Sequence, residues 1–442
     1  MVDRTTVGEP WGSAVGLLQF RGNPTHTWYG RGPAPRAPDQ LWRFPDGAMC
    51  SNSSVGSEVT RWCGTGWTGQ PAVWEHDGVT EVIFGAYDAA VHFVDAHTGQ
   101  RLRPDFRVGD LIKGSVTVDP DGYPLLYFGS RDNRLRIVAL DRDEPTELFA
   151  LEDHPDGVWN NDWDGNPSIV DGMLIEGGED SFFYALELNR AYDTAGKVTV
   201  DPEVVVEMPA WNDELLAAVG DNNVSVESSV AVFEGRAYMT NSGGRVLGVD
   251  LERVQDREAA IVFDYWLGDD ADASLVIDAA GDLYATVELE RFLPRADEVG
   301  QLVKLDPSRP DDPLVWSVAI PPREGTSGDG GAWGTPALHR GHLYATTHAG
   351  DLMVVDADDG EVVWRERIGY HEWSSPVVVD DTLIVGACEG TGIRAWNLAD
   401  PSDPSPLWTV RVGGCVESTP AVWEGRVFVG SRDGYFYAFG DR

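Results

Sequence analysis

A repeated unit runs through this chain and limits what it can fold into. Its clearest copies are WSSPVVVDDTLIVGACEGTGIRAW, residues 373–396, and ESTPAVWEGRVFVGSRDGYFYAF, residues 417–439. Each copy opens with a small polar step and a Pro or apolar residue, followed by two alternating apolar runs that Gly- or Asp-containing turns interrupt. Alternation with a period of two, broken by such turns, is typical of short antiparallel strands. The repeat therefore predicts an all-β fold built of β-meanders.

The unit occurs eight times in the 442 residues. The residues at its Pro position, which we call the markers, are Pro71, Val116, Pro167, Val230, Leu275, Pro336, Pro376 and Pro420. A sheet of four short strands cannot bury both of its faces alone, so sheets of this size stack radially around an axis. We therefore predict an eight-bladed β-propeller of four-stranded antiparallel blades.

The two ends of the chain are predicted to meet in the last blade. Several units end in a fourth strand with a bulky residue, such as Trp316, Trp364 or Trp408, but the eighth unit stops near Phe439. The missing strand appears near the other end of the chain as QLWRFP, which begins at Gln40 and contains the outer strand that we predict at residues 41–45. We expect this strand to close the ring and remove exposed sheet edges. Residues 1–40 are then an N-terminal extension, and residues 41–442 form a single propeller domain with its blades between about residues 67 and 440.

The chain is strongly acidic, with a net charge of −40 at pH 7. This charge argues against nucleic acid and anionic membrane surfaces as partners, and it favours a cation, a small molecule or a protein partner. No stretch is long and apolar enough to span a bilayer. The N-terminus lacks the basic region and apolar core of a signal peptide, so none is visible in this chain. We expect a monomer.

Four cysteines are predicted to share one face of the propeller. Cys50 and Cys63 precede the first strand of blade 1, Cys388 ends the second strand of blade 7, and Cys415 precedes the first strand of blade 8. Loops at these positions emerge on the same face, so we predict the disulfides Cys50–Cys63 and Cys388–Cys415 rather than free buried thiols. Disulfides would place the protein outside the reducing cytoplasm, in the periplasm or secreted.

A ring of chemically active residues is predicted at the channel mouth on that face. The residues three before the markers, which we call the rim residues, are Thr68, Lys113, Asp164, Glu227, Asp272, Trp333, Trp373 and Glu417. Loops on the same face add His348 and His371. Converging carboxylates repel one another, so Ca²⁺ or an organic cation is a natural occupant, with Asp164, Glu227 and Asp272 as candidate metal ligands. Trp333 and Trp373 would supply a stacking wall, although the rim tryptophans could also simply plug the channel.

The run VVDADDGEVVW, residues 354–364, resembles the propeller repeat of quinoproteins, and VDAHTGQ, residues 94–100, matches the turn of that repeat. In this repeat the Asp and Gly make the turn into the outer strand, and the Trp docks that strand on the neighbouring blade. The family includes dehydrogenases that use pyrroloquinoline quinone (PQQ) with Ca²⁺, and non-catalytic scaffolds similar to BamB. The resemblance therefore implies a fold rather than one function.

Two hypotheses for function follow. The first is an extracytoplasmic binding propeller that holds a metal ion, a small molecule or a protein partner at its acidic, disulfide-stapled face. The alternative is a PQQ- and Ca²⁺-dependent dehydrogenase that oxidises an alcohol or sugar at the same mouth, with Asp164 or Asp272 as base. The quinone dehydrogenases have a vicinal disulfide, and this chain has no adjacent cysteines. The sequence assigns no catalytic residue.

Overall fold

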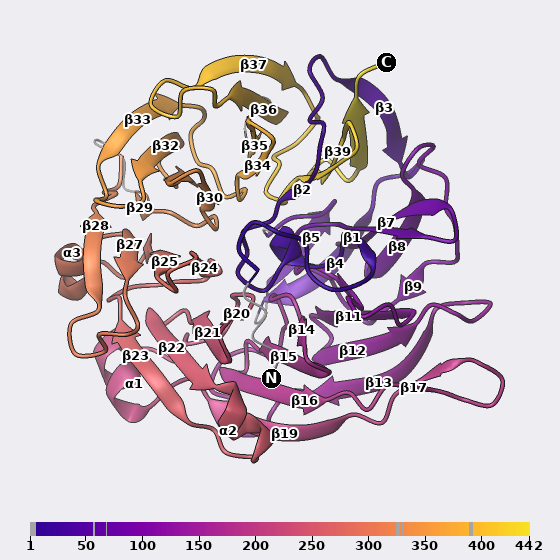
Figure 1. Cartoon of the computed structure of the whole chain (residues 1–442), viewed down its shortest axis with the longest axis horizontal. Helices are drawn as coiled ribbons and strands as arrows, with labels where there is room; N and C mark the ends of the chain where they lie inside the picture. Colours follow the sequence, from indigo (N-terminus) through magenta and orange to yellow (C-terminus); the bar gives the residue numbers. More distant parts are fainter. Residues whose placement is uncertain (1–5, 56–57, 68, 324–327, 329, 389–391) are drawn as a thin grey trace.

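The predicted fold is confirmed. The computed structural model describes residues 6–55, 58–67, 69–323, 328, 330–388 and 392–442, and it shows eight blades standing around a central axis (Figure 1). The innermost long strand of every blade begins directly after a marker residue, as β6 (Ala72–His76) follows Pro71 and β34 (Val377–Val379) follows Pro376. The repeat therefore predicts the register of the blades correctly.

The first four blades occupy the N-terminal half of the chain. Blade 1 contains β1 Val15–Leu17, β6, β7 Val79–Ala86, β8 Ala90–Asp95 and β9 Phe106–Arg107. Blade 2 contains β10 Thr117–Val118, β11 Leu125–Ser130, β12 Arg134–Ala139 and β13 Thr146–Glu152. Blade 3 contains β14 Ser168–Val170, β15 Met173–Gly177, β16 Phe182–Glu187 and β19 Glu203–Pro209. Blade 4 contains β20 Ala231–Phe233, β21 Arg236–Thr240, β22 Arg245–Asp250 and β23 Ile261–Trp266.

The other four blades complete the ring. Blade 5 contains β24 Val276–Ile277, β25 Leu283–Thr286, β27 Leu302–Leu305 and β28 Leu314–Val318. Blade 6 contains β30 Ala337–His339, β31 His342–Thr346, β32 Asp351–Asp356 and β33 Val362–Arg367. Blade 7 contains β34, β35 Thr382–Ala387, β36 Gly392–Asn397 and β37 Ser405–Val410. Blade 8 contains β2 Gly30–Arg31, β38 Ala421–Trp423, β39 Arg426–Gly430, β40 Phe436–Gly440 and β3 Asp39–Phe44.

Short insertions lie between the blade strands. The paired strands are β4 Cys50–Val55 with β5 Glu58–Cys63, β17 Ala191–Tyr192 with β18 Val198–Thr199, and β26 Glu288–Leu289 with β29 Gly330–Gly331. The helices are α1 Asp213–Val219, α2 Leu251–Gln255, α3 Pro294–Val299 and a 3-10 turn, Phe20–Gly22. Among the helices of the described residues, none is both long enough and apolar enough to cross a membrane.

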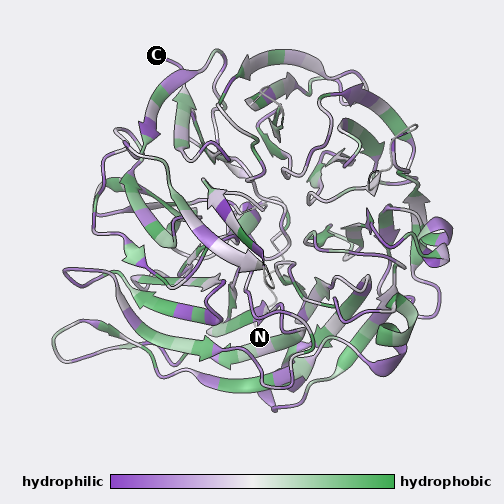
Figure 2. Ribbon diagram, turned by 180° about the vertical axis from the view of Figure 1, so that it is seen from behind, coloured by the Kyte–Doolittle hydropathy of each residue, from purple (hydrophilic) through white to green (hydrophobic). Residues whose placement is uncertain are grey.

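The core lies between neighbouring blades. Apolar side chains concentrate on the blade strands, whereas the connecting loops are largely hydrophilic (Figure 2). Tryptophans on outer strands dock on the next blade, as the resemblance implies: Trp42 Nε1 donates to the Ala96 carbonyl at 3.1 Å, and Trp316 Nε1 donates to the Ala357 carbonyl at 3.1 Å. Both rings lie over the glycine of the acceptor turn, which has a positive φ, so a larger residue would clash there.

The predicted closure of the last blade is also confirmed. β3 pairs antiparallel with β40 and forms the outer edge of blade 8. At the inner edge of the same blade, β2 pairs parallel with β38. Two segments near the N-terminus therefore enclose the C-terminal hairpin, which fixes the ends of the chain to each other.

The chain before β3 crosses the central channel (Figure 1). β1 pairs with β6 in blade 1, and hydrogen bonds reach the inner strands of the following blades. They join Leu18 to Val118 in blade 2, Trp11 to Ile169 in blade 3, Pro24 to Val232 in blade 4, Thr25 to Ile277 in blade 5 and Tyr29 to Leu338 in blade 6. All these partners follow the markers, so the segment fills the end of the channel away from the rim residues.

Arg21 lies at the centre of this segment and is fully buried. Its guanidinium donates to the carbonyls of Pro336 and Pro376 at 2.8 Å each and to that of Thr335 at 2.5 Å. These acceptors lead into blades 6 and 7, and the guanidinium carbon lies 5.1 Å from the ring centre of Tyr29. Burial lowers the pKa of Arg21 to about 10, so the side chain stays charged at neutral pH.

We predict that Arg21→Met lowers the free energy of unfolding by about 3 kcal/mol or more, because it leaves buried carbonyls without donors. Denaturant unfolding followed by tryptophan fluorescence measures the loss. Arg309→Met is the matched control: Arg309 is half exposed and pairs with Asp306, so its replacement is expected to cost about 0.5 kcal/mol or less. Equal losses in the two variants would show that the channel segment does not hold the ring together.

Candidate functional site

The rim residues are carried by the short connections that lead into each inner strand, so they gather at one mouth of the channel. Thr68 lies outside the described residues. The mouth is narrow enough to be bridged: Trp67, which precedes blade 1, donates from Nε1 to Glu227 Oε2 of blade 4 at 3.1 Å. The connections that lead into blades 1 and 4 therefore meet across the channel mouth.

Blade 3 presents three carboxylates, and Lys113 from the rim of blade 2 neutralises them. The Lys113 ammonium pairs with Asp162 at 3.0 Å, with Glu179 at 3.1 Å, and with Asp164. Oxygens of these acids all lie within 4.8 Å of one another, the spacing that a metal ion needs. The ammonium sits where a metal would sit, so this set is internally paired.

Electrostatics explain the stability of this ion cluster. Burial alone would lower the pKa of Lys113, but the charges of Asp162, Asp164 and Glu179 raise that pKa well above its ordinary value. The lysine is therefore charged at any physiological pH. Burial and the neighbouring Asp162 raise the pKa of Asp164 well above its ordinary value, because one lysine cannot fully neutralise three acids.

Blade 5 presents a second set of acids, Asp270, Asp272 and Glu288, beside Glu227 of blade 4. Arg291 pairs with Asp270 at 3.1 Å, and the Ser242 hydroxyl donates to Asp272 at 2.6 Å. Asp270 and Glu288 are each only 2% exposed. Glu288 Oε1 is buried without a hydrogen-bond partner, which is costly for a carboxylate, and the carboxyl groups of Asp270 and Asp272 hydrogen-bond to each other.

The pKa values of these acids follow from burial and mutual repulsion. Burial raises the pKa of Asp270 to about 8 although Arg291 lies beside it. Burial, and then the charge of Asp272, raise the pKa of Glu288 well above its ordinary value. Burial, and then the charge of Asp272, also raise the pKa of Glu227 well above its ordinary value. A cation at this place would relieve the repulsion.

The tryptophans of the mouth pack against one another. Trp333 and Trp373 stack with ring centres 4.8 Å apart and an angle of 6° between their planes. Trp67 meets both edge to face, at 5.7 Å and 6.0 Å. The two predicted rim tryptophans therefore cover each other's facing surfaces, and the third ring, Trp67, closes the group.

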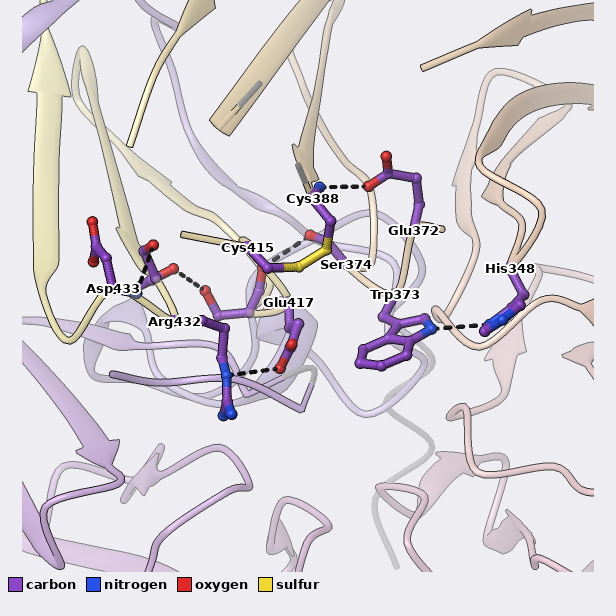
Figure 3. The surroundings of a disulfide bond; sticks show 12 residues. His348, Glu372, Trp373, Ser374, Cys388, Cys415, Glu417, Arg432 and Asp433 are labelled. Atoms are coloured by element: carbon purple, nitrogen blue, oxygen red, sulfur yellow. Dashed lines mark hydrogen bonds and ion pairs between the residues drawn. A yellow bond between two sulfur atoms is a disulfide. The ribbon is translucent and has the colours of Figure 1, made fainter. Parts of the chain in front are cut away.

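The predicted histidines join this aromatic group. Trp373 Nε1 donates to His348 Nδ1 at 3.1 Å (Figure 3), and the ring of His371 lies 4.8 Å from that of Trp373. Glu417 faces Arg432, with 3.6 Å between Oε2 and Nε. These contacts bring His348, His371 and Glu417 to the mouth, on the side of blades 6 to 8, whereas the buried acid sets lie in blades 3 and 5.

Both predicted disulfides are confirmed. Cys50 and Cys63 face each other across the β4–β5 hairpin, and Cys388 and Cys415 join blades 7 and 8. Figure 3 shows the second disulfide beside Glu417, Trp373 and Glu372, so it lies on the rim face. In the chain-entropy model, closing loops of these lengths stabilises the fold by about 3 to 4 kcal/mol each.

Some residues of the site escape prediction from the sequence. Asp162 and Asp270 stand two positions before the rim residues Asp164 and Asp272, so the pattern Asp-x-Asp before a marker was an available signal. The sequence contains no signal for the role of Trp67, because the position of this side chain depends on a positive φ of 48° at Trp67 itself, just before blade 1. Asp164, Glu227 and Asp272, the predicted metal set, divide between the two acid clusters.

A separate cleft of about 700 Å³ opens at the other end of the channel. It lies between the N-terminal segment and blades 5 to 7, and its lining includes Trp28, Tyr29, Tyr284, His339 and Arg340. None of the predicted site residues lines it. Its lining contains no cluster of buried acids like that of blade 5.

The raised pKa values predict how stability depends on pH. Between about pH 4.5 and pH 8 the folded chain holds a proton on Asp270 that the unfolded chain has released, and the raised pKa of Glu288 likewise keeps that carboxyl group protonated to a higher pH in the folded chain than in the unfolded chain. The free energy of unfolding should therefore rise as the pH falls through this range, by up to about 1.4 kcal/mol per pH unit for each such proton. Denaturant unfolding at pH 8, 7, 6 and 5 measures the slope.

Glu288→Gln should reduce this slope, because the amide cannot titrate, whereas Glu214→Gln on the exposed side of α1 should leave it unchanged. The same slope in all three proteins would mean that Glu288 titrates in the folded chain as it does in the unfolded chain.

Comparison with known proteins agrees with this fold. Residues 299–400 match the family model of the outer membrane protein assembly factor BamB. No curated protein matches the sequence.

Several solved structures share the fold at low identity. The designed protein Ika8 is 12% identical, with a TM-score of 0.59 over 92% of this chain and 100% of its own. Quinohemoprotein alcohol dehydrogenase ADHIIG from Pseudomonas putida HK5 is 11% identical, with a TM-score of 0.65 over 96% of this chain and 80% of its own. Sqt1 from Saccharomyces cerevisiae is 10% identical, with a TM-score of 0.63 over 86% of this chain and 97% of its own. Such likeness shows the fold alone. The family match covers residues 299–400, in blades 5 to 7, and over that stretch the chain is similar to the PQQ-like propeller repeat, whereas its whole length shows the fold of an eight-bladed β-propeller.

Proposed function

We propose that this chain is an extracytoplasmic binding propeller that holds a cationic ligand at the acidic, disulfide-stapled mouth of its channel. The observation that carries the proposal is the buried carboxylate oxygen Glu288 Oε1, which has no hydrogen-bond partner beside the acids Asp270 and Asp272. Leaving such groups unpaired is unfavourable, and functional sites are where folds tolerate that cost.

The shape of the channel supports the same conclusion. The N-terminal segment fills one end, so ligands would reach the rim residues from the other face. The net charge of −40 attracts cations over the whole surface, and the acids of blades 4 and 5 concentrate that attraction at the mouth. The two disulfides support a location outside the reducing cytoplasm.

A metal ion remains one form of this ligand. Lys113 already pairs with Asp164, so a metal at that carboxylate would compete with an ammonium group. Glu227 and Asp272 carry no lysine or arginine partner in any ion pair of the described residues, and they are the better candidates from the predicted set. A Ca²⁺ ion there would take oxygen ligands from both.

The dehydrogenase hypothesis meets an obstacle in the geometry. A quinone needs an open aromatic face on which to stack, yet Trp333 and Trp373 stack on each other and Trp67 lies edge-on to both. The tryptophans as arranged do not fit a quinone, so we derive no reaction step through it. The likeness to a quinohemoprotein alcohol dehydrogenase supports this alternative only at the level of the fold.

The test is thermal melting of the full chain with CaCl₂, with spermidine trihydrochloride or with PQQ plus Ca²⁺, each compared with NaCl at equal ionic strength. We expect at least one of the first two to raise the melting temperature beyond the NaCl effect, because a ligand that binds only the folded chain stabilises it. Asp272→Asn should abolish that rise, and Glu214→Gln should retain it.

No rise beyond NaCl, or an equal rise in Asp272→Asn, would refute the proposal. Saturable quenching of tryptophan fluorescence by PQQ, weakened in Trp333→Ala or Trp373→Ala, would instead establish the quinone-dependent alternative.

A further inference from the structure

Blades 3 and 5 carry the same acidic constellation at equivalent positions. Asp162 and Asp164 of blade 3 stand five and three residues before the marker Pro167, and Asp270 and Asp272 stand five and three residues before Leu275. The third acid of each set follows the end of the second strand by two residues: Glu179 follows β15, and Glu288 follows β25. We call the two sets the blade-3 nest and the blade-5 nest.

The backbone contact repeats as well. The Glu179 N–H donates to the Asp162 carbonyl at 3.0 Å, and the Glu288 N–H donates to the Asp270 carbonyl at 2.8 Å. An arginine pairs with the first acid of each nest, but it comes from different places: Arg131 follows β11 of blade 2 and pairs with Asp162 at 3.2 Å, whereas Arg291 lies in blade 5 and pairs with Asp270 at 3.1 Å. The two nests therefore share their acids and their backbone contact.

The two nests differ in the rim residue of the preceding blade that lies beside the acids. In the blade-3 nest, the rim residue of the preceding blade is Lys113, whose ammonium pairs with all three acids. The equivalent rim residue for the blade-5 nest is Glu227, which adds a negative charge instead. Trp67 donates a hydrogen bond to one oxygen of Glu227, and the Ser225 hydroxyl donates a hydrogen bond to the other at 3.1 Å.

The unpaired oxygen of Glu288 marks the place of the missing group in the blade-5 nest. Glu288 Oε1 has no hydrogen-bond partner, and Glu288 is only 2% exposed. In the blade-3 nest the ammonium of Lys113 bonds to Glu179, the counterpart of Glu288. The chain itself thus shows which chemical group such a nest accepts.

We propose that the blade-5 nest binds the protonated primary amine of a small organic ligand, in the position that the Lys113 side chain takes in the blade-3 nest. This inference rests on the proposed function and names its ligand class. The amine would donate hydrogen bonds to Asp272 and Glu288, and its carbon chain would lie beside Trp67.

The blade-3 nest favours an ammonium group over a metal ion as the guide to the ligand. Among the described residues, the acid set whose oxygens all lie within 4.8 Å of one another is that of blade 3, and even there the occupant is the ammonium group of Lys113. The blade-5 acids do not form such a set, so they are less suited to the short oxygen distances of about 2.0 to 2.6 Å that a metal ion requires.

The experiment is calorimetric titration of the full chain with n-butylammonium chloride, compared with tetramethylammonium chloride, which has the same charge but no N–H donor. We expect saturable binding of n-butylammonium only. Glu288→Gln should weaken that binding by about tenfold or more, because the ammonium group would then donate to a neutral amide oxygen in place of a charged carboxylate.

Glu227→Lys gives the sharpest test, since it supplies an internal ammonium at the position equivalent to Lys113. This variant should melt at a higher temperature than the natural chain and should no longer bind n-butylammonium. Glu214→Lys makes the same charge change on exposed α1 and should keep the binding. Should Glu227→Lys fail to fold, Glu288→Gln decides alone.

The outcomes separate this inference from the proposed function. Binding of n-butylammonium that is absent, no stronger than that of tetramethylammonium, or unchanged in both nest variants would overturn the amine inference. If Ca²⁺ or spermidine still stabilised the chain in an Asp272-dependent way, the cation-binding function would stand without it. Loss of all these responses would overturn both.

Discussion

The ring of blades depends on a segment that runs through its centre. A propeller held only by contacts between neighbouring blades could open at any interface, but here residues 11–31 hydrogen-bond to inner strands around the ring. The buried guanidinium of Arg21 replaces its water shell with three backbone carbonyls, an arrangement that is favourable only while blades 6 and 7 stay in place. This segment ends in β2, the inner edge of blade 8, and the chain continues into β3, the outer edge of the same blade, so channel filling and ring closure are coupled through the N-terminal part of the chain.

Filling one end of the channel gives the two faces of the propeller different properties. The far end holds the N-terminal segment, whereas the rim face collects carboxylates, tryptophans and both disulfides. Buried acids destabilise a fold unless they are paired, and in the blade-3 nest Lys113 provides that pairing. The blade-5 nest repeats the acids without the lysine. A site that is electrostatically incomplete beside one that is complete is the strongest functional signal in the molecule.

The sequence predicts the architecture because the repeat is local. Strand alternation, turn residues and the marker positions place all eight inner strands, and QLWRFP identifies the closing strand. Positions relative to the markers also bring the predicted rim residues to one mouth, and the location of the cysteines predicts both disulfides.

Features that depend on contacts across the channel were beyond such reasoning. The role of Arg21 rests on acceptors more than 300 residues away, and that of Trp67 on Glu227 in a blade across the mouth. The acids divide into two nests because Lys113 of blade 2 pairs with the acids of blade 3. Only the three-dimensional structure shows that the Lys113 side chain points toward blade 3. The stacking of Trp333 on Trp373 likewise distinguishes a closed aromatic group from an open wall, and spacing along the chain does not contain that information.

The central claim is that the blade-5 nest is an ammonium site, and its most direct test is a crystal structure of the chain with 3-bromopropylammonium, in which anomalous scattering locates the bromine. The account predicts one bromine peak beside Trp67, with the ammonium nitrogen within hydrogen-bonding distance of Asp272 and Glu288. A peak only in the cleft near Tyr29 and His339, or no peak at the channel mouth under saturating ligand, would contradict it.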